Sequence, residues 1–170
     1  MNVYDMTVPQ LIKILGQVRS WLDKAEAHAA QKKFDVGVLL EARLAPDQFP
    51  LTRQVQAACD QAKLNVARLA GVKAPPFEDN EKTLDELRAR IDKTVDWLKT
   101  VTPEQLAGSE ERTFTVPWMP GKGIKGADLL VSGALPNFYF HASHAYAILR
   151  HNGVDVGKRD FLGDLPFFDI

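Results

Sequence analysis

The sequence predicts an all-α protein: a four-helix bundle with an irregular loop or short hairpin before its last helix. Four long segments carry apolar residues at spacings of three and four, which is typical of helices that bury one face. Only one short stretch alternates in the manner of a strand. The chain has 170 residues, 45% of them apolar, which is enough for one hydrophobic core. We therefore expect a single domain over residues 1–170.

The first long helix is expected over residues 8–32. Thr7, with Gln10 three residues later, has the form of a capping box, and Pro9 is tolerated in a first helical turn. A short helix is expected next, within residues 35–44, because an aspartate opens that segment and a proline follows it.

The second and third long helices have clear boundaries. The second is expected over residues 51–70 and ends at Gly71, since glycine accepts a left-handed backbone. The third begins after Thr83, whose capping-box partner is Glu86, and its apolar stripe continues to Leu98. The connections after both helices are long enough for a crossover, so the order of the helices in the bundle stays open.

The last third of the chain is less regular. Residues 110–125 contain glycines, prolines and a short alternating run, which favours an extended excursion or a hairpin. A helical segment over 128–134 is expected next, and Pro136 should kink or restart it before a helix over 136–151. The apolar tail, residues 161–170, is expected to pack on the body, because exposed phenylalanines favour aggregation.

Composition excludes several classes of function. The net charge is −1 and there is no basic block, which argues against a nucleic-acid partner. No apolar run reaches the ~20 residues of a membrane helix, and the first residues do not resemble a secretion signal. The single cysteine, Cys59, is interpreted as a core residue that forms no intrachain disulfide, which suits a cytoplasmic protein.

The last helix carries the densest polar cluster. Asn137, His141 and His144 follow at spacings of four and three, so they share one face of a helix that is otherwise apolar. His141 and His144 are therefore candidate metal ligands or catalytic groups. The alternative is that they are core histidines held by hydrogen bonds, with His151 explained by the helix C-terminus. The candidates for a further ligand are Asp47, Gln54, Asp60 and His28.

A metal-free pocket for a small ligand is the second interpretation of this region. Aromatic residues stand close to polar ones here, and the loop before the last helix is long. Arg43 and Arg150 lie in apolar sequence, where an arginine either pairs with an acid, such as Asp47 or Asp160, or binds a carboxylate or phosphate. The predicted lining is Arg43, Trp118, Tyr139, Tyr146, Arg150 and the two histidines.

Two stretches carry a resemblance: EARLAPDQFPLTRQVQAACDQAK, residues 41–63, and NFYFHASHAYAILRHNGVDVGKRDFLG, residues 137–163. They look like the signature blocks of a bacterial and fungal family of unknown function that is grouped with the DinB/YfiT-like superfamily. The resemblance implies a DinB-like four-helix bundle, commonly dimeric, with a metal or active-site pocket between helices. Many such relatives hold a divalent metal with three histidines. Some are thiol transferases or isomerases that use bacillithiol, mycothiol or glutathione.

The chain departs from the three-histidine pattern. His141 matches the second histidine of the superfamily's HxxxH motif, but Asn137 stands at the first, and the second predicted helix has no histidine. The three-histidine site is therefore absent, and binding of zinc, nickel, manganese or iron would require an altered ligand set. That set would be His141 and His144 with a carboxylate or amide such as Asp47 or Gln54.

Three hypotheses follow. In the first, the chain is a metal- or thiol-dependent enzyme in which His141 is a ligand or general base and His144 a second ligand or proton donor. In the second, it is a metal-free module that binds a small ligand. In the third, it is an interaction protein with core histidines and a bundle face that forms a homodimer. The resemblance ranks the first slightly above the second.

Overall fold

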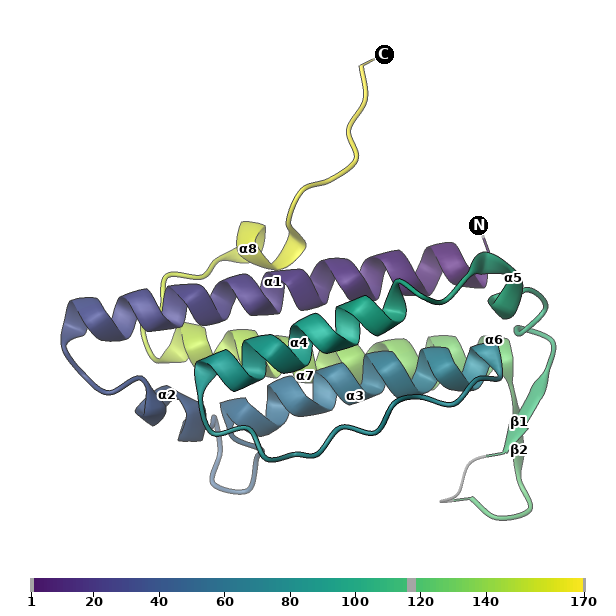
Figure 1. Cartoon of the computed structure of the whole chain (residues 1–170), viewed down its shortest axis with the longest axis horizontal. Helices are drawn as coiled ribbons and strands as arrows, with labels where there is room; N and C mark the ends of the chain where they lie inside the picture. The colour runs from purple at the N-terminus through teal and green to yellow at the C-terminus, as the bar shows by residue number, and fades with distance from the viewer. Residues whose placement is uncertain (1, 116–118, 170) are drawn as a thin grey trace.

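The computed structural model describes residues 2–115 and 119–169, and it confirms the all-α bundle (Figure 1). Two short strands pair as a hairpin beside the helices. The four long helices are α1 (Val3–Lys32), α3 (Leu51–Ala70), α4 (Leu84–Leu98) and α7 (Leu135–His151). The shorter elements are α2 (Gly37–Glu41), α5 (Pro103–Leu106), β1 (Thr113–Thr115), β2 (Gly123–Lys125), α6 (Gly126–Leu129), the π-helical turn Leu130–Ala134 and α8 (Lys158–Leu162).

The helices pack in the cyclic order α1, α4, α3, α7. Arg19 of α1 pairs with Asp92 of α4 at 2.9 Å, and Arg88 of α4 pairs with Asp23 of α1 at 2.8 Å, so these two helices are antiparallel. The helices α3 and α4 run parallel, and residues 71–83 cross the length of the bundle to join them (Figure 1). The connection between α3 and α4 is therefore a crossover, one of the arrangements that its length allowed.

A buried ion network fastens this crossover to the bundle. The side chain of Arg90 on α4 is only 1% exposed. Its Nη2 lies 2.9 Å from Asp60 on α3 and 2.8 Å from Asp79 on the crossover, and its Nη1 lies 3.0 Å from Glu81. Lys63 adds a second buried cation, 3.3 Å from Asp60. One arginine therefore joins two helices and the connection between them.

The first helix begins earlier than the sequence predicts. Its N-cap is Asn2, whose side chain accepts a hydrogen bond from the N–H of Asp5 at 2.9 Å. Thr7 lies inside the helix, where its hydroxyl donates to the carbonyl of Val3 at 2.6 Å. The expected capping box at Thr7 is therefore wrong, and Pro9 is an interior residue of α1. A threonine can satisfy its hydroxyl within a helix as well as at its start.

The other helix boundaries agree closely with the sequence. The helix α3 covers the expected residues and ends at Gly71, whose φ is 71°. The start of α4 is the expected capping box, with Thr83 accepting from the N–H of Glu86 at 3.2 Å. The short helix expected within residues 35–44 is α2, and Asp35 accepts from the N–H of Gly37 at 2.9 Å.

The segment before α7 is one continuous helix that widens rather than breaks. The π-helical turn joins α6 to α7, and the N–H of Leu135 donates to the carbonyl of Leu130. Pro136 has no N–H to donate to Ser132, so the backbone passes this position in the wider π register. Where a kink or restart is expected at Pro136, the structure has a π-helical turn that leads directly into α7.

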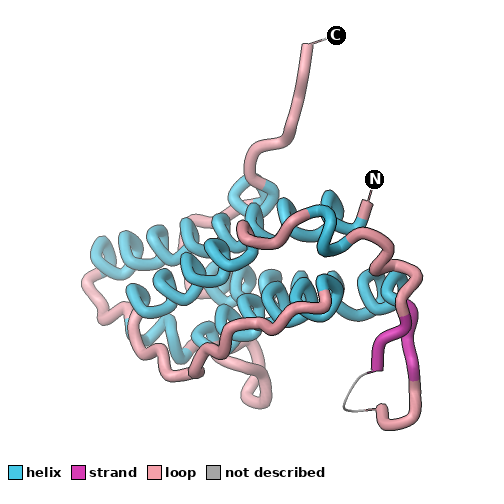
Figure 2. Tube along the Cα trace, turned by 45° about the vertical axis from the view of Figure 1, so that its right-hand side comes forward, coloured by secondary structure: helices cyan, strands magenta, loops and turns pink. Residues whose placement is uncertain are grey.

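The hairpin and the C-terminal tail both leave the bundle (Figure 2). Of the two alternatives expected for residues 110–125, the structure shows the hairpin, in which Phe114 pairs with Ile124 in an antiparallel ladder. The tail differs from its expectation, because Phe167 and Phe168 are 87% and 83% exposed. Only its start packs on the body, where Phe161 stacks on Trp21 at 5.4 Å between ring centroids. No helix in the described part of the chain is long and apolar enough to cross a bilayer.

Candidate functional site

His141 projects from α7 toward α3, where Gln54 holds its ring. The residue is 8% exposed, and its Nδ1 lies 2.8 Å from Oε1 of Gln54. The amide nitrogen of Gln54 donates to the carbonyl of Phe49 at 3.3 Å, which turns the amide oxygen toward the histidine. An amide oxygen only accepts hydrogen bonds, so Nδ1 of His141 donates the proton. The lone pair of a neutral His141 ring is then on Nε2.

Aromatic side chains flank this imidazole. The Phe49 ring stacks on His141 with 6.3 Å between centroids, and the Phe140 ring meets it edge-on at 5.2 Å. Phe140 also lies 4.0 Å from the ring of His144, whose Nδ1 donates to the carbonyl of Phe140 at 2.7 Å. Phe49 and Phe140 are about half exposed. We call His141, Gln54, Phe49, Phe140 and His144 the His141 cluster.

The surroundings of His141 favour its neutral form. Burial lowers the pKa of the imidazole, because removing water disfavours the charged ring. The nearby His144 and the cationic Arg53 lower that pKa further by charge repulsion. In this neutral tautomer the Nδ1–H donates to Gln54. Nε2 can accept a proton or bind a ligand.

A separate cavity lies between α3 and α7. Asn137 lies one helical turn before His141 on α7 and lines this cavity. The facing residues come from α3, and the cavity measures about 380 Å³. The lining residues are Gln61, Leu64, Asn65, Arg68 and Asn137.

The structure does not bring the predicted carboxylate ligands to the two histidines. Within residues 2–115 and 119–169, no three His, Cys, Asp or Glu side chains come together as a set of ligands. Nδ1 of both His141 and His144 is hydrogen-bonded, so Nε2 is the ring nitrogen that either histidine could offer to a metal. Asp47 is exposed in the loop before α3, and Asp60 pairs with Arg90 on the α4 side. Of the predicted further ligands, Gln54 is thus the one that contacts His141, and it does so as a hydrogen-bond partner.

The predicted ligand-binding residues are spread over the molecule. Arg43 donates to the carbonyls of Pro46 and Gln48, at 3.4 and 3.3 Å, and so braces the loop before α3. Arg150 is 3.8 Å from Asp155, whereas its predicted partner Asp160 pairs with Lys24. Trp118 lies outside the described residues.

The two predicted tyrosines lie away from the His141 cluster. The ring of Tyr139 contacts Phe138 at 5.4 Å, and burial raises the pKa of its phenol. Tyr146 packs against Trp21 at 5.6 Å, and its hydroxyl donates to the carbonyl of Val156 at 3.4 Å. Tyr146 therefore helps to hold the segment that follows α7.

Cys59 is a core residue, as the sequence predicts. It is a free thiol with no exposed surface, on the side of α3 that meets α4. Burial raises the pKa of its thiol to about 12, which suppresses the reactive thiolate at neutral pH. The thiol is therefore inert in the folded protein.

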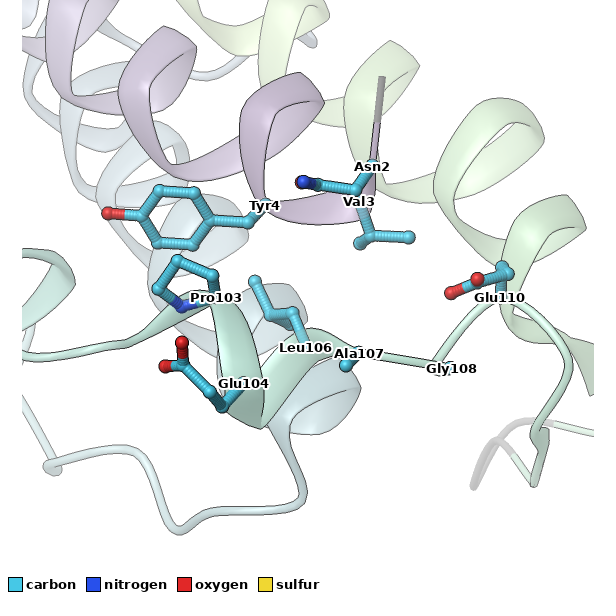
Figure 3. Close-up of a pocket in the computed structure, with 9 residues that line it drawn as sticks. All are labelled: Asn2, Val3, Tyr4, Pro103, Glu104, Leu106, Ala107, Gly108 and Glu110. Carbon is cyan, nitrogen blue, oxygen red and sulfur yellow. The ribbon is translucent and has the colours of Figure 1, made fainter.

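A second cavity, of about 250 Å³, lies between the start of α1 and α5 (Figure 3). Tyr4 and Glu110 stand at opposite sides of it, and Pro103 and Leu106 lie between them. The polar groups at its edge have local roles, since Asn2 caps α1 and Glu104 bonds to Thr102. No chemistry is indicated there.

Sequence reasoning missed two aromatic residues and one arginine of the site. Phe49 and Phe140 form the walls of the His141 cluster, and Arg53 lies over the Phe49 ring at 5.6 Å. Phe49 stands immediately before Pro50, the N-cap of α3, a position where an apolar residue often packs against the first turns of a helix. This position before the N-cap is the sequence signal from which the packing of Phe49 could have been predicted.

Comparison with known proteins identifies the family. Residues 3–162 match the model of a domain of unknown function, DUF1993. A solved structure, a DinB family member protein from Shewanella denitrificans, is 46% identical, with a TM-score of 0.96. The match covers 99% of this chain and 96% of that chain. No match is found among proteins with curated descriptions. The chain therefore belongs to the DUF1993 family of DinB-like proteins.

Proposed function

We propose that the chain acts on a small molecule at the His141 cluster, with Nε2 of His141 as the proton acceptor and His144 as an assisting proton donor. The site is metal-free in this proposal. The substrate carries an O–H or S–H group, so both alcohols and thiols are possible substrates. His141 acts as a general base, since its Nε2 bears a lone pair when the ring is neutral.

The observation that carries the proposal is the 2.8 Å hydrogen bond between His141 and Gln54. A hydrogen bond at Nδ1 selects the tautomer and aims the other nitrogen, which is how proteins prepare a histidine for proton transfer. The lowered pKa of His141 keeps the ring in its proton-accepting form near neutral pH. Phe49 and Phe140 supply apolar walls around a polar group, as in many small-molecule sites.

Nitrogen NMR of the histidine rings tests this proposal. We expect His141 to titrate below the ordinary value of about 6.5 and, when neutral, to carry its proton on Nδ1. The Gln54→Leu variant should lose this tautomer preference, whereas Gln17→Leu on α1 should not. Titration at or above the ordinary pKa, or a proton on Nε2, would contradict the proposal. One equivalent of metal in untagged protein, lost in His141→Ala, would favour the metal-dependent enzyme instead.

The same pKa shift predicts a dependence of stability on pH. The unfolded chain binds the His141 proton more readily than the folded chain does, because the folded pKa is lowered. The stability due to neutral His141 is therefore present above pH ~6.5 and is lost as the pH falls below that value. The His141→Ala variant should flatten this part of the stability curve.

We also propose that the protein is a cytoplasmic homodimer. The support is apolar surface on the tail, where Phe167 and Phe168 are exposed, and a single buried cysteine, which suits a reducing compartment. Light scattering at micromolar concentration should give twice the chain mass of 18.9 kDa. A mass of one chain would contradict the dimer.

A further inference from the structure

The segment that follows α8 is attached to α1 and then turns away from the bundle. Nζ of Lys13 on α1 donates to the carbonyl of Asp164 at 2.5 Å. Residues 165–169, which we call the arm, then extend away from the helices (Figure 1). Phe167 and Phe168 of the arm are 87% and 83% exposed. Contiguous apolar surface of this kind marks interaction sites on soluble proteins.

A wide hollow lies at the base of the arm. It measures about 740 Å³ and is formed by α1, α8 and the arm itself. Its apolar lining comes from Leu162, Leu165 and Phe167, and Gln17 lines it from α1. Leu162 and Leu165 are 41% and 48% exposed, so the chain's own side chains leave this space open. We call it the α8 hollow.

The charges around the α8 hollow leave one cation unmatched. Asp160, which lines the hollow, pairs with Lys24 at 2.6 Å. Asp164 also lines it, beside the ammonium group of Lys13. Arg159 is an exposed lining residue on α8, and no acidic side chain within residues 2–115 and 119–169 pairs with it. The hollow therefore offers a guanidinium to an incoming acidic group.

We propose that the α8 hollow is the docking site for the arm of a second copy of this chain, so that two copies exchange arms. This inference rests on the proposed homodimer and names its interface. The arm carries the matching groups, since apolar Phe168 is followed by the acidic Asp169. Phe168 then fills the hollow, and Asp169 pairs with Arg159 of the partner subunit. Both contacts occur twice, as a twofold axis requires.

The area of the arms suits a stable dimer. A covered phenylalanine buries roughly 200 Å², so the two exposed rings offer about 350 Å² per chain. The surface that covers an arm has a similar area, so the exchange of two arms buries about 1,400 Å² in total. Specific protein interfaces bury roughly 1,200–2,000 Å². The exchanged arms therefore supply an interface of ordinary size.

Light scattering of the full chain over a range of concentrations tests the arm. The double variant Phe167→Ser/Phe168→Ser should weaken the dimer at least about tenfold and give the mass of one chain at micromolar concentration. Val38→Ser provides the matched control, because Val38 is 63% exposed on α2, away from the arm. A dimer of unchanged strength in the double variant overturns the arm exchange and leaves a homodimer on another surface standing.

A charge swap tests the α8 hollow. Arg159→Asp should weaken the dimer, and Asp169→Arg added to the same chain should restore it, because both intersubunit pairs are then reversed. Arg150→Asp, at an exposed arginine on α7, should leave the dimer unchanged. Failure of the swap to restore the dimer overturns the hollow as the docking site. A parent chain of single mass overturns the homodimer and this inference together, whereas the tautomer of His141 tests the proposed chemistry separately.

Discussion

Replacing Arg90 with alanine is expected to lower the free energy of unfolding by about 3–5 kcal/mol. The guanidinium is almost fully buried between α3, α4 and the crossover, within 3.0 Å of Asp60, Asp79 and Glu81. Its removal leaves these carboxylates close together in a poorly hydrated site without their shared cation. Urea unfolding monitored by circular dichroism measures the effect.

A surface ion pair provides the matched control. Arg19 pairs with Asp92 at 2.9 Å, but both side chains are about half exposed. The Arg19→Ala variant should therefore change stability by less than about 1 kcal/mol. Arg90→Lys, which keeps the charge but loses the planar fork, should fall between the two. If Arg90→Ala and Arg19→Ala cost the same, the buried network does not fasten the crossover.

Replacing Trp21 with alanine is expected to destabilise the protein by about 3–5 kcal/mol. Its ring has no exposed surface, and it stacks on Phe161 and meets Tyr146 edge-on. Its Nε1 also donates to the carbonyl of Asp160 at 3.1 Å, which ties α8 to α1. Chemical unfolding measures the loss, and limited proteolysis of the native variant should cut near α8 sooner than in the parent.

The Trp21→Phe variant separates the two roles of this residue. Phenylalanine keeps an aromatic ring in the core but cannot donate to Asp160. We expect a smaller loss of stability than with alanine, together with a partial increase in cleavage at α8. Unchanged proteolysis in both variants would show that Phe161 and Lys24 hold α8 without the tryptophan.

Local signals account for the helices that the sequence predicts well. Gly71 and the Thr83–Glu86 capping box mark the end of α3 and the start of α4, because each satisfies backbone groups within a few residues. A local signal also misled the prediction of where α1 begins. Thr7 and Pro9 have the form of a helix start but lie inside the helix. The prediction that the tail packs on the body was wrong, because the exposure of these residues depends on the direction that the chain takes after α8. No local sequence pattern encodes that direction.

The site was predicted only in part. The face of α7 that carries His141 follows from spacing alone, and Gln54 was a candidate from its position on the second helix. Its role as an orienting acceptor depends on α3 lying antiparallel beside α7, which is tertiary information. Phe49 contacts His141 across more than ninety residues of sequence, so periodicity carries no signal for that contact.

The crossover of residues 71–83 bears on how the chain folds. Helices joined by a tight turn can pair early as a hairpin, because little chain entropy is lost when their ends meet. The parallel pair α3 and α4 has no such route, since each contact between them, such as Asp60 with Arg90, closes a loop that contains the whole connection. This raises the contact order above that of a simple up-and-down bundle and slows folding accordingly. The buried ion network can form only after that closure, so its stabilisation acts chiefly by slowing unfolding.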